Sequence, residues 1–221
     1  MTDERHVLVI FPHPDDETFS SAGTLANYIQ KGIPVTYACL TLGQMSRNLG
    51  NPPFATRESL PSIRERELEE ACKVIGITDL RKMGLRDKTV EFEPYEHIDG
   101  MIKSLIDDTN PSLIISFYPG YAVHPDHEAT ADAVIRTVER MPKEERPRLT
   151  LVAFSNDATE ALGEPDIQND ITDFKELKIK AFEAHASQTG PFLKQLASPE
   201  IDGKQHSFLT VEPYWTYHFK S

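Results

Sequence analysis

Short apolar runs alternate along most of the chain with segments that have helical periodicity. The runs are rich in Val, Leu, Ile and Phe, which is typical of strands buried on both faces of a sheet. They cover residues 7–11, 34–42, 79–83, 113–117 and 149–154, and the pattern is weakest in 79–83. Each run is therefore predicted to form one strand of a sheet that is covered on both faces.

The segments between these runs carry apolar residues at the three- and four-residue spacing of amphipathic helices. They cover residues 18–31, 62–75, 95–108 and 127–140. Ser62 and Glu65 form a capping-box pattern at the start of the second segment, and Gly76 follows its end. Strands that alternate with helices predict an α/β fold, namely a Rossmann-like, doubly wound, mainly parallel sheet with helices on both faces.

The alternation stops near residue 155, and the rest is expected to be a C-terminal elaboration. Residues 156–170 are predicted to be a polar loop. Asp173 and Glu176 can cap a helix that reaches about residue 187. Residues 207–219 have an aromatic, strand-like pattern, in which Pro213 favours an edge strand or a bulge.

Length and charge narrow the class of protein. The 221 residues suffice for one substantial domain, which we expect to span residues 1–221. The 35 acidic residues outnumber the 23 basic ones and give a net charge of −12, which argues against a nucleic-acid partner and against an anionic membrane surface. The apolar run 7–11 is too short for a signal-peptide core or a membrane span, so a cytoplasmic protein is predicted.

Two loops of similar sequence follow the runs 7–11 and 113–117. One contains His13-Pro-Asp-Asp16 and the other His124-Pro-Asp-His127. Ligands of open α/β sheets bind at the carboxyl ends of the strands, so these clusters can face each other across a crevice. Imidazoles with one carboxylate favour Zn²⁺, and Fe²⁺ or another divalent ion tolerates the same ligands. Taken singly, Asp16 could be an ordinary helix cap and the histidine pair a surface turn.

The number of ligands distinguishes a structural metal site from a catalytic one. If His13, Asp16, His124 and His127 all bound the ion, its coordination would be closed. If one of these four residues does not bind the ion, water can occupy the open coordination position. Asp15 then lies where a general base is needed. His124 could then act as acid and oxyanion stabiliser, with Asp126 placed to orient it. A metal phosphohydrolase and a non-catalytic metal-binding module are the competing interpretations.

These motifs also carry a resemblance to a known family. Pro12-His13-Pro14-Asp15-Asp16-Glu17 together with the 124–127 cluster resembles the LmbE/PIG-L family of metal-dependent N-deacetylases. Arg64-x-x-Glu67-Leu68 and His185-Ala-Ser-Gln188 are similar to weaker motifs of that family. The resemblance spans residues 7–188, and the chain as a whole is most similar to the bacillithiol biosynthesis deacetylases.

The resemblance implies a division of roles. The metal ligands would be His13, Asp16 and His127, and Asp15 would be the base. His124 would stabilise the tetrahedral intermediate and protonate the leaving amine, and Arg64 would contact the substrate. The implied substrate is N-acetylglucosaminyl malate, a small N-acetyl sugar conjugate. Amides of thiol S-conjugates and other N-acyl sugars are the alternatives.

Several further residues are candidates for substrate contacts. Arg47, Arg57 and Arg64 are available to meet the carboxylates of malate, and the Tyr121 phenol could hydrogen-bond an oxyanion. The competing interpretations are solvated charges for the arginines and simple aromatic packing for the tyrosine. The sequence leaves open whether the loop 43–61 closes as a lid and whether His185 contributes to the site. It also leaves the oligomeric state open, although apolar surface on a shared face would fit a homo-oligomer.

Overall fold

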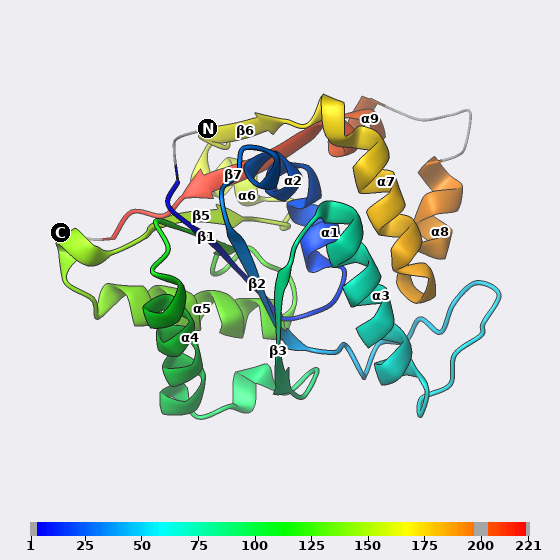
Figure 1. The fold of residues 1–221 in the computed structure, drawn as a ribbon, viewed down its shortest axis with the longest axis horizontal. Helices are drawn as coiled ribbons and strands as arrows, with labels where there is room; N and C mark the ends of the chain where they lie inside the picture. The colour runs from blue at the N-terminus through cyan, green and yellow to red at the C-terminus, as the bar shows by residue number, and fades with distance from the viewer. Residues whose placement is uncertain (1–3, 197–202, 220–221) are drawn as a thin grey trace.

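The computed structural model describes residues 4–196 and 203–219, within which one seven-stranded sheet is formed. Its strands lie in the order β3-β2-β1-β4-β5-β7-β6 (Figure 1). The five strands predicted from the apolar runs are β1 (Val7–Phe11), β2 (Val35–Thr41), β3 (Asp79–Leu85), β4 (Leu113–Phe117) and β5 (Arg148–Val152). These five are mutually parallel, so the predicted mainly parallel α/β architecture is confirmed.

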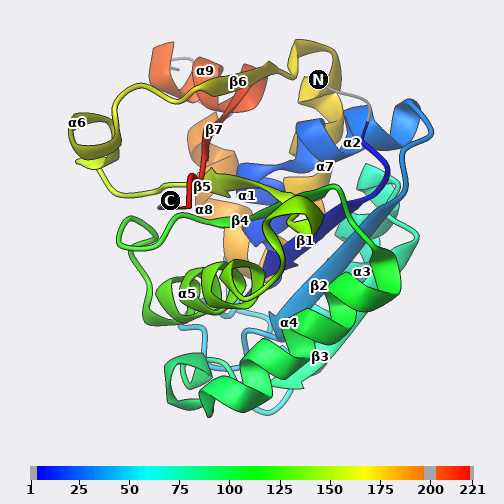
Figure 2. The ribbon, with the colours of Figure 1, turned by 90° about the vertical axis from the view of Figure 1, so that its left-hand side faces the viewer.

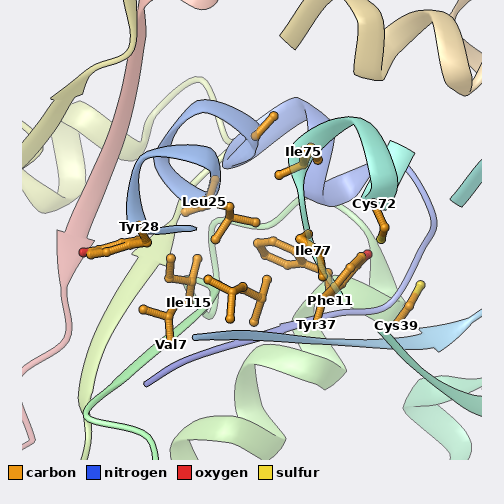
Figure 3. Close-up of a cluster of buried hydrophobic side chains, with 14 of the residues drawn as sticks. Val7, Phe11, Leu25, Tyr28, Tyr37, Cys39, Cys72, Ile75, Ile77 and Ile115 are labelled. Atoms are coloured by element: carbon orange, nitrogen blue, oxygen red, sulfur yellow. The ribbon is translucent and has the colours of Figure 1, made fainter. Parts of the chain in front are cut away.

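Helices cover both faces of this sheet because successive side chains of a strand point to opposite faces. The helices α2 (Ala22–Gln30), α3 (Leu60–Ile75) and α7 (Lys175–Ala184) lie on one face, and α4 (Tyr95–Thr109) and α5 (Pro125–Glu139) lie on the other (Figure 2). Figure 3 shows the first layer, where Phe11 and Tyr37 of the strands pack under Leu25 of α2 and Cys72 of α3. Leu8 and Ile10 point the other way, toward α4 and α5.

The strand order places a crevice at the carboxyl end of the sheet. From β1 the chain moves outward through β2 to β3, then crosses over to β4 and β5 on the other side of β1. The loops that leave β1 and β4 therefore diverge at a topological switch point, which is where doubly wound sheets bind their ligands. Both His-Pro-Asp loops lie there.

Three helix starts differ from the prediction, and that of α5 is described with the site. The segment 18–31 forms two helices, α1 (Asp16–Ser20) and α2. The helix α3 begins at Leu60 with Pro61 in its first turn, where the missing N–H leaves no hydrogen bond unmade. The predicted Ser62–Glu65 capping box is therefore wrong, because both residues lie inside the helix.

The C-terminal third departs most from the predictions. The predicted loop 156–170 contains α6 (Ala158–Leu162) and β6 (Ile167–Asp170). The predicted helix from 173 to 187 breaks at His185, between α7 and α8 (Ala186–Leu196). The helix α9 (Gly203–Thr210) precedes β7 (Val211–Thr216). The remaining short turns are the 3₁₀ segments η1 (Val90–Phe92), η2 (Lys143–Glu145) and η3 (Thr172–Phe174).

The strand β7 is internal, not the edge strand that Pro213 led us to expect. It lies antiparallel between β5 and β6. Because β5 pairs only with Trp215 and Thr216, Pro213 has a paired neighbour on the β6 side alone, where it stands opposite Gln168. A proline is tolerated at such a one-sided position.

Among the residues that the structure describes, no helix combines the length and the apolar composition needed to cross a bilayer. The single-domain organisation expected for residues 1–221 stays a prediction.

Candidate metal and active site

The loop after β1 turns sharply to bring its polar side chains into the crevice. Asp15 adopts a left-handed conformation with φ of 96°, and α1 begins at Asp16. The backbone N–H of His13 donates to Asp16 Oδ2 at 2.9 Å, which fixes the carboxylate beside the imidazole. His13, Asp15 and Asp16 all line one cavity of about 680 Å³.

The structure brings together the three predicted metal ligands. His13 Nδ1 lies 3.1 Å from His127 Nε2, which is 3.2 Å from Asp16 Oδ1. The His13 Nδ1 atom is also 3.6 Å from Asp16 Oδ2. Ligand bonds of about 2.0–2.1 Å at tetrahedral angles place ligand atoms about 3.3 Å apart, so one divalent ion fits between these atoms.

The outer nitrogens of both rings are held in place. His13 Nε2 donates to Asp126 Oδ2 at 3.1 Å, and His127 Nδ1 donates to the carbonyl of Ala122 at 2.9 Å. When both rings are neutral, these hydrogen bonds leave lone pairs on His13 Nδ1 and His127 Nε2, the two nitrogens that face each other. Two lone pairs and a carboxylate that converge in a buried site repel one another unless a cation lies between them. The donor set therefore fits a metal ion.

Asp126 and Asp87 act on His13. We expected the Asp126 carboxylate to orient His124, but it lies against His13 Nε2, and Asp87 Oδ1 approaches the same nitrogen at 3.2 Å. Burial acts to lower the pKa of His13, whereas hydrogen bonds to these two carboxylates raise it to about 10 in the metal-free protein. Burial acts to raise the pKa of Asp87, but His13 lowers it to about 2, so the group stays ionised.

His124 is oriented by a backbone group instead. It stands immediately before α5, which begins at Pro125, two residues earlier than predicted, and its Nδ1 accepts the N–H of Asp126 at 3.1 Å. In the neutral ring the proton is then on Nε2, which makes this nitrogen a donor toward the cavity and not a ligand. Burial, together with the nearby His13 and His127, lowers the pKa of His124 and keeps the ring neutral. This geometry favours three protein ligands and an open coordination position, although one ring nitrogen each of His13, His124 and His127 lie within 4.8 Å of one another.

Asp15 is held by Arg64. Arg64 Nη2 lies 3.1 Å from Asp15 Oδ2 and also donates to the carbonyl of Pro14, and Nη1 donates to the carbonyl of Gly43 at 3.0 Å. Burial raises the pKa of Asp15 to about 6, although the charge of Arg64 acts to lower it. Arg64 also lines the cavity, so its guanidinium holds the predicted base at the edge of the space for a substrate, and its expected substrate contact stays a prediction.

The other predicted substrate contacts divide into two groups. Arg47 lines the cavity. Arg57 donates to the carbonyl of Ser46, Tyr121 packs against Tyr118 with ring centroids 5.9 Å apart, and neither is among the described residues that line it. These contacts favour the competing interpretations, a solvated charge for Arg57 and aromatic packing for Tyr121, and the substrate contacts of both stay predictions.

A buried pair that the sequence analysis did not assign lies beneath the cavity. His185 Nε2 is 2.7 Å from Glu17 Oε1, and both side chains are fully buried. Burial acts to lower the pKa of His185, but the charge of Glu17 raises it. His185 is therefore packed under the site, and it is not among the described residues that line the cavity.

Asp87 and Lys88 were also missed, although a signal for them existed. They follow the carboxyl end of β3, as the two recognised motifs follow β1 and β4. The weak apolar pattern at 79–83 hid this, because β3 has only one buried residue, Leu85.

The loop 43–61 is attached to the start of α8. Ser46 Oγ donates to Gln188 Oε1 at 2.6 Å, Gln188 Nε2 donates to the carbonyl of Asn48 at 3.3 Å, and the N–H of Gly50 donates to the carbonyl of Ser187 at 3.0 Å. Whether the loop moves as a lid stays a question for experiment.

Comparison with known proteins agrees with this site. A family model described as PIG-L: GlcNAc-PI de-N-acetylase matches residues 8–138, which contain both His-Pro-Asp loops. The "Probable N-acetyl-alpha-D-glucosaminyl L-malate deacetylase 2" of Bacillus anthracis is 49% identical over 100% of this chain and 98% of that protein.

Solved structures share the fold. N,N'-diacetylchitobiose deacetylase from Pyrococcus horikoshii superposes with a TM-score of 0.71 at 25% identity, over 97% of this chain and 84% of that one. GalB, the 4-carboxy-2-hydroxymuconate hydratase from Pseudomonas putida, gives 0.74 at 15% identity over 98% of both chains, a likeness of fold alone. Since the family model covers more than half of the chain and a full-length relative is 49% identical, the chain belongs to the PIG-L family of de-N-acetylases, hydrolases of an acetamide bond, as its two His-Pro-Asp motifs predicted.

Proposed function

We propose that this protein removes the acetyl group from an N-acetylglucosaminyl conjugate and that N-acetylglucosaminyl L-malate is its substrate. The observation that carries the proposal is the convergence of His13, Asp16 and His127 beside Asp15 and His124 on one cavity. The 49% identity to the Bacillus anthracis relative supports malate as the second half of the conjugate. The fold alone supports neither the deacetylase reaction nor the malate conjugate as substrate, because a hydratase has the same fold.

We assign the metal site to His13, Asp16 and His127, with Zn²⁺ as the expected ion and Fe²⁺ as the alternative. When bound, such an ion supplies Lewis-acid polarisation and lowers the pKa of water at the site. The chain would then contribute two groups to the reaction. Asp15, oriented by Arg64, takes a proton from the attacking water, and His124 donates a hydrogen bond from Nε2 to the oxygen that develops negative charge.

Collapse of the tetrahedral intermediate breaks the C–N bond and needs a proton on the nitrogen. Protonated Asp15 can return the proton that it took from water, and acetate and the free amine then leave. His124 is the alternative donor that the resemblance implies, and in that role its imidazole would have to be protonated before it gives the proton to the amine. In either case one water is consumed and one amide bond is cleaved.

The test is release of free amine from N-acetylglucosaminyl L-malate and from N-acetylglucosamine, with metal-loaded and chelated protein. Metal-dependent turnover that is much faster on the malate conjugate is the expected result. Asp15→Asn should retain the metal and lose most activity. Tight metal binding with no turnover of any N-acyl substrate would contradict the proposal and favour the metal-binding module. Amides of thiol S-conjugates and phosphate esters are the comparison substrates for the competing interpretations.

The cytoplasmic location, the homo-oligomer and the absence of nucleic-acid and membrane partners remain predictions from the sequence.

A further inference from the structure

We propose that Lys88, together with Arg47, forms the part of the cavity that binds the carboxylates of the substrate, and that this pair selects anionic conjugates over neutral ones. The inference rests on the proposed deacetylase function and assigns to Lys88 a specificity role that the sequence analysis did not give it. Four observations support it.

The first observation is that the other candidate arginines are already engaged. The Arg64 guanidinium holds Asp15 and two backbone carbonyls, and Arg57 donates to the carbonyl of Ser46 outside the cavity lining. Within the described part of the chain, Arg47 and Lys88 line the cavity and have no carboxylate in ion-pair distance. They are thus the cavity cations with charge available for a ligand.

The second observation concerns the backbone of Lys88. Its φ of 63° is uncommon for a residue with a side chain. The conformation is held because the Lys88 N–H donates to Asp126 Oδ2 at 2.7 Å, and the same carboxylate oxygen lies 3.1 Å from His13 Nε2. The preceding residue, Asp87, contacts that nitrogen as well. The backbone of Lys88, from which its side chain starts, is therefore held relative to the predicted metal ligands by one shared carboxylate.

The third observation is where the strand order places charge around the cavity. Arg47 follows β2 and Lys88 follows β3, which lie on one side of β1 in the sheet (Figure 1). Val123 and Phe154 follow β4 and β5 on the other side, and they also line the cavity. The side of β2 and β3 thus offers two cations, with the Asp87 carboxylate beside them turned to His13 Nε2 at 3.2 Å, and the other side offers apolar surface. A bound substrate would therefore place its charged half toward β2 and β3.

The fourth observation is the charge of the chain as a whole. With a net charge of −12, the protein repels anionic solutes at long range. Two exposed cations beside the site counter that repulsion locally. An arginine matches a carboxylate in bidentate geometry, and a lysine supplies a compact second charge. A dicarboxylate such as malate can engage both.

The test compares kcat/KM for N-acetylglucosaminyl L-malate with that for the neutral methyl N-acetylglucosaminide. The ratio of the two values measures anion selection and cancels effects common to both substrates. Lys88→Gln should lower this ratio about tenfold, the factor for losing one hydrogen bond to a charged group, and mainly through KM. The double variant with Arg47→Gln should lower it further. Lys31→Gln, an exposed lysine at the end of α2, is the matched control and should leave the ratio unchanged.

A second measurement does not depend on turnover. Calorimetric binding of glucosyl L-malate, which lacks the acetamide, should weaken about tenfold in Lys88→Gln and not in Lys31→Gln. If the wild type releases no amine from either substrate, the proposed function fails, but this binding difference still decides the role of Lys88. Equal binding by wild type and Lys88→Gln, or an unchanged substrate ratio, would overturn the inference.

Discussion

Glu17 offers a sharp test of how the site is supported. Its fully buried carboxylate accepts from the N–H of Asp15 at 3.1 Å and from Tyr37 Oη at 3.1 Å through Oε2. Through Oε1 it accepts from Thr18 Oγ1 at 2.8 Å and meets His185 Nε2 at 2.7 Å. Glu17→Gln keeps the shape of the side chain but replaces one oxygen with an NH₂ group.

The expected loss of stability follows from these contacts. The new NH₂ group faces donors, and each buried donor left without an acceptor costs about 1–3 kcal/mol. If the amide replaces Oε1, His185 also loses its charged partner, and removing one member of a buried ion pair costs about 3–5 kcal/mol. These two costs, for the unpaired donors and for the broken ion pair, describe the same contacts, so they are not summed. We expect Glu17→Gln to lower the free energy of unfolding by about 3–5 kcal/mol.

Urea denaturation of the chelated proteins measures this difference without a contribution from bound metal. Glu160→Gln, an exposed residue of α6, is the control and should change stability by less than about 0.5 kcal/mol. The zinc affinity of Glu17→Gln should fall as well. Tyr37 Oη, which donates to Glu17, also donates to the carbonyl of His13 at 3.2 Å, so a change at Glu17 reaches a predicted metal ligand. A loss below about 1 kcal/mol with unchanged zinc affinity would refute the reasoning, because the network would then carry little energy.

Three further predictions concern the site itself. His124→Gln should keep the metal and lower kcat about 10²–10³-fold; loss of metal in an equilibrium-dialysis assay would instead make His124 a ligand. The pKa of His13 is raised to about 10 in the metal-free protein. Protonated His13 therefore stabilises that protein fully below pH 6.5, and this stabilisation is lost as the pH rises through 10. Metal binding near pH 8 should accordingly release about one proton, and calorimetry that gives the same heat in two buffers of different ionisation enthalpy would contradict this. Gly43→Ala would place a Cβ against Arg64 Nη1, so activity should drop far more than in Gly32→Ala. Gly32 also has a left-handed φ, 76° against 59° for Gly43, but an added Cβ there meets no atom within 4 Å. Equal activity of the two variants would show that Arg64 is not needed where it lies.

The local pattern of the chain was enough to predict the five parallel strands, most helices and the two motifs. The buried runs 7–11 and 113–117 coincide with β1 and β4 residue for residue, because a continuous apolar run of β-forming residues has few other structures open to it. The motifs at 13–16 and 124–127 could be paired from their positions in the chain, since parallel strands direct their following loops to the same edge. Local patterns misled where tertiary contacts outweigh propensity, as in β6 and α9.

Only the tertiary structure decided what the individual side chains do. For Arg64 the sequence indicated only a substrate contact, and the structure adds that hydrogen bonds to the carbonyls of Gly43 and Pro14 direct its guanidinium to Asp15. Glu17 and His185 lie 168 residues apart in sequence, so no periodicity could join them. The sequence by itself determined which residue types reach the carboxyl edge of the sheet, because the alternation of strands and helices follows from local patterns and places the loops after parallel strands at one edge. Which atom of each side chain meets which partner depends on packing between distant segments, and that is settled only when the chain is folded.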